Sequence, residues 1–262
     1  VEIVKTQTVP DLYYSSREAL KCERFDGIAW GLQTYIEEIL CAWIANNCKH
    51  YNINSVVISG GVAQNIKACK LIAELPEVKH FRVGPISGDG SIGVGAAWLA
   101  ARKFAPDQEI RGLPHIYLGT EHDLSSIDKA IEARNLKSKF FILDNPSSDD
   151  VAEWLDKGLI VSRFSGRMEF GQRALGNRSI LADPRRWESV ERINSKIKYR
   201  DFWMPFTPSM MIEEVERLIE NPKNLDSPYM TLAFDMQEPH RTSIPAAQHP
   251  ADKTARPQML KR

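Results

Sequence analysis

The chain has 262 residues, of which 43% are hydrophobic, so it can bury a core without disulfides or structural metals. Its 34 basic residues balance its 34 acidic residues, which excludes a general electrostatic attraction to nucleic acid or membranes. Four cysteines without C-x-x-C spacing exclude a zinc-ribbon framework, and no apolar run reaches the roughly 18 residues of a membrane span. The chain also opens without a secretory signal pattern, and we expect a cytoplasmic protein with reduced thiols.

The first hundred residues predict helices that alternate with short β-branched strands. Residues 1–23 show no clean periodicity, whereas apolar residues recur at helical spacing from Phe25 to Tyr51. The elements expected next are a strand at 53–59, a turn at Gly60-Gly61, a helix to Leu75, a strand at 80–83, and a glycine-rich segment leading into a helix to Phe104.

A change in composition marks a predicted domain boundary. Residues 105–123 mix proline, glycine and charge without periodicity, so we expect a linker between a unit at 1–104 and a truncated second unit at 124–262. The expected elements of the second unit are helices at 124–134, 148–157 and 186–197, and strands at 139–143, 159–164, 206–212 and 229–234. This alternation predicts a mixed α/β fold, and both ends of the chain are expected to be cuts within a longer protein.

The stretch from Arg163 to Arg200 is strongly basic. It holds eight Arg and two Lys against four acidic residues, an excess of six positive charges in a neutral chain. Guanidinium groups bind phosphate bidentately, and glycines at 166, 171 and 176 allow close backbone approach, so the pattern favours an anionic ligand. The alternative is a solvated basic face with turn glycines. The alternation of Gly and Arg between apolar strand residues favours the phosphate site.

The same segment carries a family resemblance. Residues 166–179, GRMEFGQRALGNRS, closely resemble the G-R-x-E-x-G-x-R-A-L-G-x-R-S signature of the NodU/CmcH carbamoyltransferases. Residues 193–209 and 249–258 are similar to two further stretches of the family. The departures from these two stretches are Asp201, Met204, Thr207 and residues 250–253. The resemblance covers roughly residues 24–262.

The resemblance implies both architecture and activity. Residues 1–104 would be the C-terminal part of an actin/Hsp70-like (ASKHA) ATPase-type domain, and the remainder a YrdC-like α/β domain. Such enzymes are expected to make carbamoyl-adenylate from ATP and carbamoyl phosphate, and then to carbamoylate a hydroxyl of a sugar, a nodulation factor or a secondary metabolite. The implied cofactors are ATP with Mg²⁺ and a divalent metal such as iron. A homodimer is one expected assembly.

Residue by residue, the resemblance implies catalytic roles for Arg167, Arg173 and Lys198. The residues expected to contact ATP or carbamoyl phosphate are Arg167, Arg173, Arg178, Ser179, Lys198, Arg200 and Arg256. The spacing of Lys198 and Arg200 would place both side chains on one face of a strand, and the alternative is the charged end of a helix. Glu169 is expected to orient one of the arginines.

In the first unit, Gly60, Gly61 and Asn65 resemble the strand–turn–helix that receives a nucleoside in the ATPase superfamily. A plain turn is the alternative. Asp89, flanked by two glycines at the start of a helix, resembles one ligand of the family's metal, and the alternative is a helix N-cap. The six histidines include no H-x-x-x-H pair, so the other metal ligands are expected outside this chain.

Two competing functions remain at this point. One is carbamoyl transfer of the hydrogenase-maturation type, which would need zinc-finger modules that the cysteine spacing does not show. The other is an RNA- or phosphate-binding module without carbamoyl transfer. The basic residues are concentrated in one short segment and are not spread along an extended surface, so small phosphates are favoured over RNA as the partner.

Overall fold

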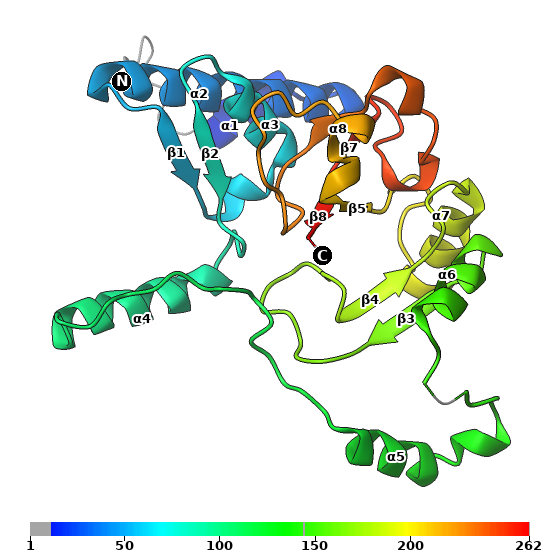
Figure 1. Ribbon diagram of the computed structural model, residues 1–262. Coiled ribbons are helices and arrows are strands. Elements are labelled where there is room, and N and C mark those ends of the chain that lie inside the picture. The colour runs from blue at the N-terminus through cyan, green and yellow to red at the C-terminus, as the bar shows by residue number, and fades with distance from the viewer. Residues whose placement is uncertain (1–11, 144, 262) are drawn as a thin grey trace.

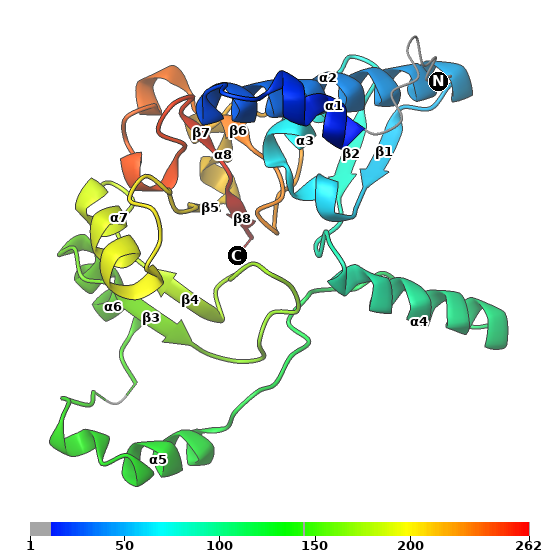
Figure 2. The same ribbon diagram turned by 180° about the vertical axis from the view of Figure 1, so that it is seen from behind.

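The computed structural model describes residues 12–143 and 145–261 (Figure 1). Predictions for residues 1–11 and for Arg262 lie outside the described residues. The long helix α2 runs along one side of the molecule, with the pair β1–β2 and helix α3 beneath it (Figure 1). Helices α4 and α5 project away from the main body, and the last strand, β8, ends near the centre of the molecule (Figure 2).

The first hundred residues form helices around one parallel strand pair. The elements are α1 (Leu12–Ala19), α2 (Phe25–Tyr51), β1 (Ser55–Ile58), the 3-10 turn η1 (Gly61–Gln64), α3 (Ile66–Glu74), β2 (His80–Val83) and α4 (Gly90–Phe104). Helix α2 ends where Asn52 adopts a left-handed conformation and donates its backbone N–H to Cys48 and Lys49. Helix α3 begins at Asn65, whose side chain accepts the N–H of Ala68 at 3.1 Å.

The remaining residues form short helices and short strands. The α-helices are α5 (Leu124–Ala133), α6 (Ser148–Asp156), α7 (Trp187–Ile193) and α8 (Val215–Leu218). The strands are β3 (Val161–Phe164), β4 (Arg178–Leu181), β5 (Ser209–Met211), β6 (Phe234–Asp235), β7 (Thr254–Ala255) and β8 (Gln258–Leu260). The other turns are η2 (Leu136–Ser138), the π-helix η3 (Asn194–Lys198), η4 (Ile212–Glu214), η5 (Glu238–His240) and η6 (Pro245–Ala247).

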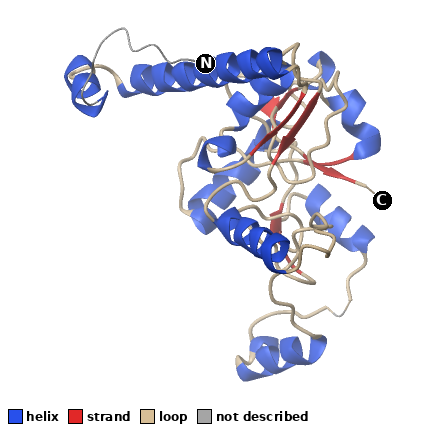
Figure 3. Ribbon diagram, turned by 90° about the vertical axis from the view of Figure 1, so that its left-hand side faces the viewer, coloured by secondary structure: helices blue, strands red, loops and turns tan. Residues whose placement is uncertain are grey.

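The strands pair two by two. Strands β1 and β2 are parallel, as are β5 and β8, whereas β3 pairs antiparallel with β4 and β6 with β7. In the β3–β4 pair Arg163 lies opposite Ser179 and Phe164 opposite Arg178, which places the two ends of the intervening loop, residues 165–177, side by side. The strands lie inside the molecule and the helices mostly outside it (Figure 3).

The main hydrophobic core joins the two ends of the described chain. Buried residues of α3 and β2, such as Ile72 and Phe81, pack in one cluster with Ile219, Leu232 and Met259 from the C-terminal fifty residues. A smaller cluster contains Ile86, Ile116, Leu175 and Met230. The core therefore crosses the segment 105–123, and the domain division at that segment stays a prediction.

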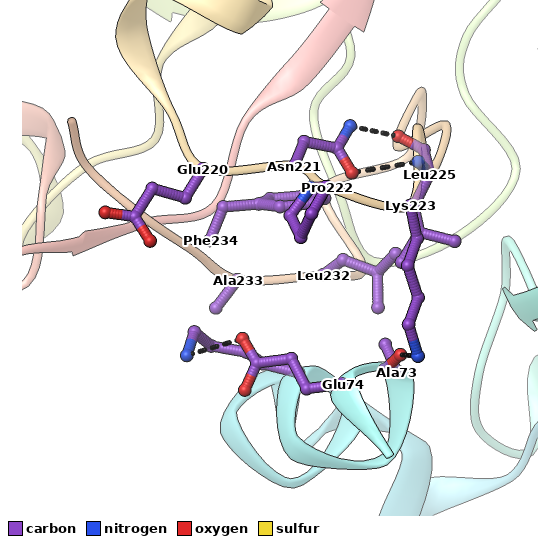
Figure 4. A pocket seen from close by; sticks show the side chains of 11 residues that line it. Ala73, Glu74, Glu220, Asn221, Pro222, Lys223, Leu225, Leu232, Ala233 and Phe234 are labelled. Carbon is purple, nitrogen blue, oxygen red and sulfur yellow. Dashed lines mark hydrogen bonds and ion pairs between the residues drawn. The ribbon is translucent and has the colours of Figure 1, made fainter. Parts of the chain in front are cut away.

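Lys223 fastens the C-terminal segment to the end of α3. Its ammonium group donates to the carbonyls of Ala73, Leu75 and Val78 at 2.7, 2.7 and 2.6 Å, at the negative end of the helix dipole (Figure 4). Asn221 closes the loop that carries Lys223 with two 2.9 Å hydrogen bonds to the backbone of Leu225. The cavity between this loop and α3 holds only about 90 Å³, and these contacts explain it as a packing junction.

Most predicted elements are confirmed, and the mixed α/β class is confirmed with them. Helices expected at 25–51, 124–134 and 148–157 form within a residue or two of their predicted ends, and the helix expected to end at Phe104 does so. The assignment of the first unit to the ASKHA class stays a prediction. None of the described helices combines the length and the apolar character that a membrane span requires.

Three predictions about secondary structure are wrong. The strand expected at 139–143 is absent, because Phe140 and Phe141 have no partner strand among the described residues and lie 64% and 90% exposed. Of the strand expected at 229–234 only Phe234 is extended with a partner, since Met230 has a φ of +57° and breaks the run. Helix α1 lies within residues 1–23, for which the sequence predicted no element, so it is an addition to the prediction and not an error.

The third error concerns Lys198 and Arg200. They do not share one face of a strand. Lys198 ends the π-helix η3, and Tyr199 follows at a φ of +49°. The alternative, the charged end of a helix, is the one that the structure forms.

Candidate anion-binding site

The residues of the resemblance segment fold into a loop that is organised by one buried carboxylate. In this signature loop, residues 165–177, Glu169 is 7% exposed, and its Oε1 accepts the backbone N–H groups of Leu175 at 2.7 Å, Asn177 at 2.9 Å and Arg178 at 3.3 Å. Burial opposes ionisation of Glu169, but the three N–H donors prevail and hold its pKa below the ordinary value. The expectation that Glu169 orients an arginine side chain is wrong, because its described partners are backbone groups.

Three other elements fix the position of the loop. The backbone of Phe170 donates to Ile116 at 2.6 Å, and Gly119 donates to Met168 at 2.9 Å. The carbonyl of Leu175 accepts both the Tyr117 hydroxyl at 2.8 Å and the buried Gln258 amide at 3.0 Å. The loop is thus held against residues 116–119 on one side and against β8 on the other.

The loop also contacts the first unit. Gln172 and Gln64 both donate to the carbonyl of Ser87, at 3.3 and 2.6 Å. Gly171 has a φ of +133°, and a Cβ there would lie 3.4 Å from Ile86, so the turn requires glycine for its backbone and leaves little space beside it. The signature loop therefore lies directly against the segment that follows β2.

Two of the eight arginines in the basic segment are neutralised. Asp183 is buried, and its carboxylate accepts from Arg185 Nε at 2.8 Å and from Arg186 Nε at 3.1 Å. The Arg185 hydrogen bonds outweigh the opposing effect of burial and lower the pKa of Asp183 to about 2. These two arginines are structural ion-pair partners and are not available to a ligand.

Arg178 is occupied by the protein itself. Its guanidinium donates to the carbonyls of Ser165 at 2.9 Å, Gly166 at 3.1 Å and Asn177 at 3.1 Å, and it stacks 3.6 Å above the Phe164 ring. These contacts close the base of the signature loop. The predicted role of Arg178 as a ligand contact is untested, and its guanidinium N–H groups donate to carbonyls of the signature loop.

Three other arginines converge from distant parts of the sequence. Arg173 and Arg200 lie close enough to Arg256 for their charges to lower its pKa, although burial is the larger cause, and the two effects together bring it to about 10. Burial also lowers the pKa of Arg173 and of Arg200. We call Arg173, Arg200 and Arg256 the arginine cluster. None of the three forms an ion pair with a carboxylate within residues 12–143 and 145–261.

Neutral groups hold two members of the arginine cluster, Arg200 and Arg256, in place. Arg200 donates from Nε to the buried side chain of Asn194 at 2.6 Å, and its guanidinium lies 4.5 Å from the centre of the Phe206 ring. Arg256 donates from Nη2 to the Thr207 hydroxyl at 2.8 Å. Half-buried cations that are positioned by neutral partners and repel one another form a site for an anion, because an anion is the group that relieves the repulsion.

The remaining predicted ligand contacts lie elsewhere in the basic segment. Arg167 is exposed and donates to the Leu118 carbonyl at 3.1 Å, and the Ser179 hydroxyl accepts the N–H of Gly176 at 2.9 Å. Lys198 is exposed at the end of η3 and has no partner in the described part of the chain. No described contact joins these three residues to the arginine cluster, and their binding roles stay predictions.

A cavity of about 260 Å³ lies behind two residues that support the arginine cluster. Phe206 and Thr207, which contact Arg200 and Arg256, both line it. Its other walls are mostly apolar and come from α6, β4, α7 and the turn η6. The arginine cluster therefore has an apolar hollow as its neighbour.

The predicted site of the first unit shows structural contacts of its own. Gly60 has a φ of +95° at the turn after β1, and Gly61 begins η1. Asn65 caps α3 and exchanges two hydrogen bonds with Gln33, at 2.9 and 3.1 Å. Their nucleotide role is untested.

Asp89 takes the N-cap position of α4, as the alternative predicted, although its side chain makes no capping hydrogen bond. Among the described residues no three His, Cys, Asp or Glu side chains are grouped to hold a metal. The residues present therefore do not assemble the metal site that the resemblance implies, and a metal at Asp89 stays a prediction.

Sequence reasoning overlooked two neutral residues that position the arginine cluster, Asn194 and Thr207, and one that positions the signature loop, Gln258. Asn194, Thr207 and Gln258 lie inside the two stretches, 193–209 and 249–258, on which part of the resemblance rests. Their place in those stretches was the available signal. Periodicity and charge, by contrast, give no reason to select a neutral side chain.

Comparisons with known proteins agree with the geometry. Residues 152–262 match the family model described as carbamoyltransferase C-terminus. An uncharacterized protein of Methanocaldococcus jannaschii, MJ1058, is 32% identical over 238 residues, which are 90% of this chain and 39% of that protein. The nodulation protein NolNO of Sinorhizobium fredii is 33% identical over 239 residues, 88% of this chain and 34% of that protein.

A relative whose printed name states an activity is the 3'-hydroxymethylcephem-O-carbamoyltransferase of Amycolatopsis lactamdurans. It is 29% identical over 175 residues, 66% of this chain and 31% of that protein. The chain spans less than half the length of each of these three relatives.

Proposed function

The chain belongs to the NodU/CmcH-type carbamoyltransferase family, and from this we propose that its arginine cluster binds the phosphate groups of ATP and carbamoyl phosphate. The full-length protein would then be an ATP-dependent O-carbamoyltransferase that acts on a small hydroxylated acceptor. One observation supports the phosphate site most directly. Arg173, Arg200 and Arg256 are brought together without a carboxylate partner, and they repel one another.

The chemistry explains why a cluster of cations is needed. The carbonyl carbon of a carbamoyl group is a weak electrophile until it carries a good leaving group. Water would first release phosphate from carbamoyl phosphate to give carbamate. An oxygen of carbamate would then displace pyrophosphate from the α-phosphate of ATP, which gives carbamoyl-adenylate. Negative charge builds up on the departing pyrophosphate, and pre-positioned guanidinium groups stabilise it, typically by a few kcal/mol for each well-placed donor.

The second step transfers the carbamoyl group. The acceptor hydroxyl would attack the carbamoyl carbon of carbamoyl-adenylate and release AMP, with loss of the hydroxyl proton. The resemblance assigns this step to the first unit. The contact of Gln64 and Gln172 with the same Ser87 carbonyl supports a short path between the two units. Mg²⁺ would accompany ATP, and no step proposed for this chain passes through the metal predicted at Asp89.

The test is exchange of labelled pyrophosphate into ATP by the full-length protein, measured with and without carbamoyl phosphate. We expect exchange that requires carbamoyl phosphate. It should fall at least a hundredfold in Arg173→Ala, because the variant loses a proposed phosphate contact. The variant should stay folded, because Arg173 has no structural partner to lose among the described residues. Arg134→Ala, at the exposed end of α5, is the matched control and should exchange normally.

Two outcomes would contradict the proposal. One is pyrophosphate exchange that does not depend on carbamoyl phosphate, and the other is the absence of exchange in a folded protein that binds ATP. The RNA- or phosphate-binding module would then be the better reading of the arginine cluster.

A further inference from the structure

One buried asparagine lies behind the arginine cluster. Asn194 is 1% exposed, follows α7 directly and begins the π-helix η3. Its main-chain carbonyl accepts the backbone N–H of Tyr199 and also that of Arg200, the latter at 3.2 Å. The chain therefore turns back at the end of η3, and Arg200 returns to the residue six positions before it.

The side chain of Asn194 uses its acceptor and its donors in different directions. Its Oδ1 accepts from Arg200 Nε at 2.6 Å, whereas its Nδ2 donates to the carbonyls of Asp201 at 3.1 Å and Met204 at 3.0 Å. A guanidinium has donors only and a carbonyl is an acceptor only, so the amide fits in a single orientation. One side chain thus fixes both the Arg200 guanidinium and the loop 199–204 that carries it.

Tyr199 shows that this turn is held against a local preference. It has a φ of +49° and a ψ of +52°, a left-handed conformation that a bulky residue rarely adopts. Its side chain is 83% exposed, so packing of the ring contributes little to the turn. Strain of this kind persists where the surroundings over-determine it, and the hydrogen bonds of Asn194 do so here.

The contacts of Arg200 leave one end of its guanidinium for a ligand. Nε donates to Asn194, Nη2 donates to the Pro205 carbonyl at 3.4 Å, and the guanidinium stacks 4.5 Å from the centre of the Phe206 ring. Within the described part of the chain Nη1 has no hydrogen-bond partner. Arg200 can therefore reach a phosphate oxygen with one end while Asn194 holds the other.

The neutral charge of Asn194 matters as much as its shape. Asp183 is a buried partner of Arg185 and Arg186, and its carboxylate cancels both of their charges. Asn194 contacts Arg200 from an equally buried position, but an amide leaves the positive charge available to a ligand. The two buried acceptors therefore divide the arginines of the basic segment into structural and ligand-ready groups.

We infer that Asn194 is the residue that positions Arg200 for phosphate groups, and that it must be an amide to do so. The inference rests on the proposed phosphate site and adds the residue that orients one of its three cations. Alanine would leave Arg200 without its anchor. Aspartate would cancel the charge of Arg200 and place a carboxylate oxygen against two carbonyls. Asn194 is a positioning residue, because it acts on the ligand only through Arg200.

The test is the affinity of the full-length protein for inorganic tripolyphosphate, measured by calorimetry. We expect it to fall roughly tenfold or more in Asn194→Ala, Asn194→Asp and Arg200→Ala, each of which loses a positioned charged contact. The double variant Asn194→Ala/Arg200→Ala should bind as weakly as Arg200→Ala, since a residue that acts through Arg200 has no effect without it. Asn46→Ala and Asn46→Asp, at an exposed position on α2, are the matched controls and should bind as wild type does.

Two results would overturn the inference. One is wild-type affinity in the folded Asn194 variants. The other is a double variant that loses a further factor of about ten beyond Arg200→Ala, because additive losses are what a purely structural role of Asn194 would give.

Two further variants retain Asn194 and so do not depend on the folding of its substitutions. Arg200→Lys keeps the charge, but one ammonium group cannot reproduce the separate directions of Nε and Nη1, so affinity should again fall roughly tenfold. Tyr199→Gly suits the left-handed turn, and it should bind within about twofold of wild type and melt at the same or a higher temperature. Wild-type affinity in Arg200→Lys, or a tenfold loss in Tyr199→Gly, would contradict the inference.

Failure of the proposed function gives a different result. A folded wild-type protein that does not bind tripolyphosphate lacks the phosphate site, and the inference falls with it. If wild type binds tripolyphosphate and exchanges pyrophosphate, and Asn194→Ala does both equally well, the proposed function stands and only the role of Asn194 is wrong.

Discussion

Arg256 donates from Nη2 to the hydroxyl of Thr207 at 2.8 Å. This is the one hydrogen bond of the Arg256 guanidinium among the described residues, although Arg173 and Arg200 lie near it. A neutral hydroxyl fixes the direction of the side chain without cancelling its charge. The ligand-free site therefore keeps an uncompensated repulsion, which costs stability and is relieved when an anion binds.

Replacement of Arg256 by Gln should therefore stabilise the ligand-free protein while removing its response to phosphate. We expect the melting temperature without ligand to rise by about 2–4 °C for each kcal/mol of repulsion that is removed. Phosphate should raise the melting temperature of wild type and of the exposed control Arg134→Gln, but not that of Arg256→Gln. Thermal unfolding with and without phosphate measures both effects, and an equal phosphate response in all three proteins would place the anion elsewhere.

Glu169→Gln should loosen the signature loop. The amide keeps an acceptor oxygen but loses the charge that three backbone N–H groups stabilise, and its NH₂ group has no acceptor to meet there. We expect the free energy of unfolding to fall by about 1–3 kcal/mol, measured by urea denaturation. Glu188→Gln changes an exposed carboxylate on α7 and should leave stability within about 0.5 kcal/mol of wild type.

Arg173 and Arg178 should respond differently to the same substitution. Lysine cannot reproduce the fork by which Arg178 reaches several carbonyls, so Arg178→Lys should destabilise the protein by about 1–3 kcal/mol. Arg173→Lys removes no described hydrogen bond, and its stability should stay near that of wild type while pyrophosphate exchange falls. Equal losses of stability in both variants would contradict the division between loop support and ligand contact.

Acid should weaken the protein through Asp183. Its folded pKa of about 2 lies below the value near 3.9 of an unfolded chain, so the ionised carboxylate adds stability above pH 4. That contribution, about 2 kcal/mol, is lost as the pH falls from about 4 to about 2. Urea unfolding at pH 5 and pH 2.5 should show a smaller acid effect in Asp183→Asn than in wild type. The exposed variant Asp128→Asn should keep the wild-type acid effect.

Lys223→Met should separate the C-terminal segment from α3. Methionine retains the apolar length of the side chain but leaves the carbonyls of Ala73, Leu75 and Val78 without their cation. We expect a loss of about 2 kcal/mol in the free energy of unfolding. Lys129→Met on the exposed face of α5 is the control. A variant as stable as wild type would mean that water replaces the ammonium group at no cost.

Local patterns predicted most helices and the basic segment, because both features depend on residues that are close together in the sequence. The amphipathic run of α2 and the Ser147–Asp150 capping box of α6 are examples, since each depends on contacts within one or two turns. The number of arginines between Arg163 and Arg200 also indicated a concentration of cations, and Arg173 and Arg200 of the arginine cluster come from that stretch.

The composition of the site could not be predicted in the same way. Arg173, Arg200 and Arg256 are separated by 27 and 56 positions, and only tertiary packing brings them together. The basic count treated Arg185 and Arg186 as equal to Arg173, whereas a single buried carboxylate, Asp183, removes both of them from the ligand site. Charge totals do not show which cations already have partners.

The shared core has a consequence for synthesis of the chain. Ile72 and Phe81 are made early, but the residues that cover them, Leu232 and Met259 among them, are made 151 to 187 positions later. A nascent chain that has reached α5 on the ribosome still exposes the apolar face of α3 and β2 to water. This core can close only after translation has passed β8, so the early segment stays incompletely packed during elongation for longer than an independently folding domain of its size.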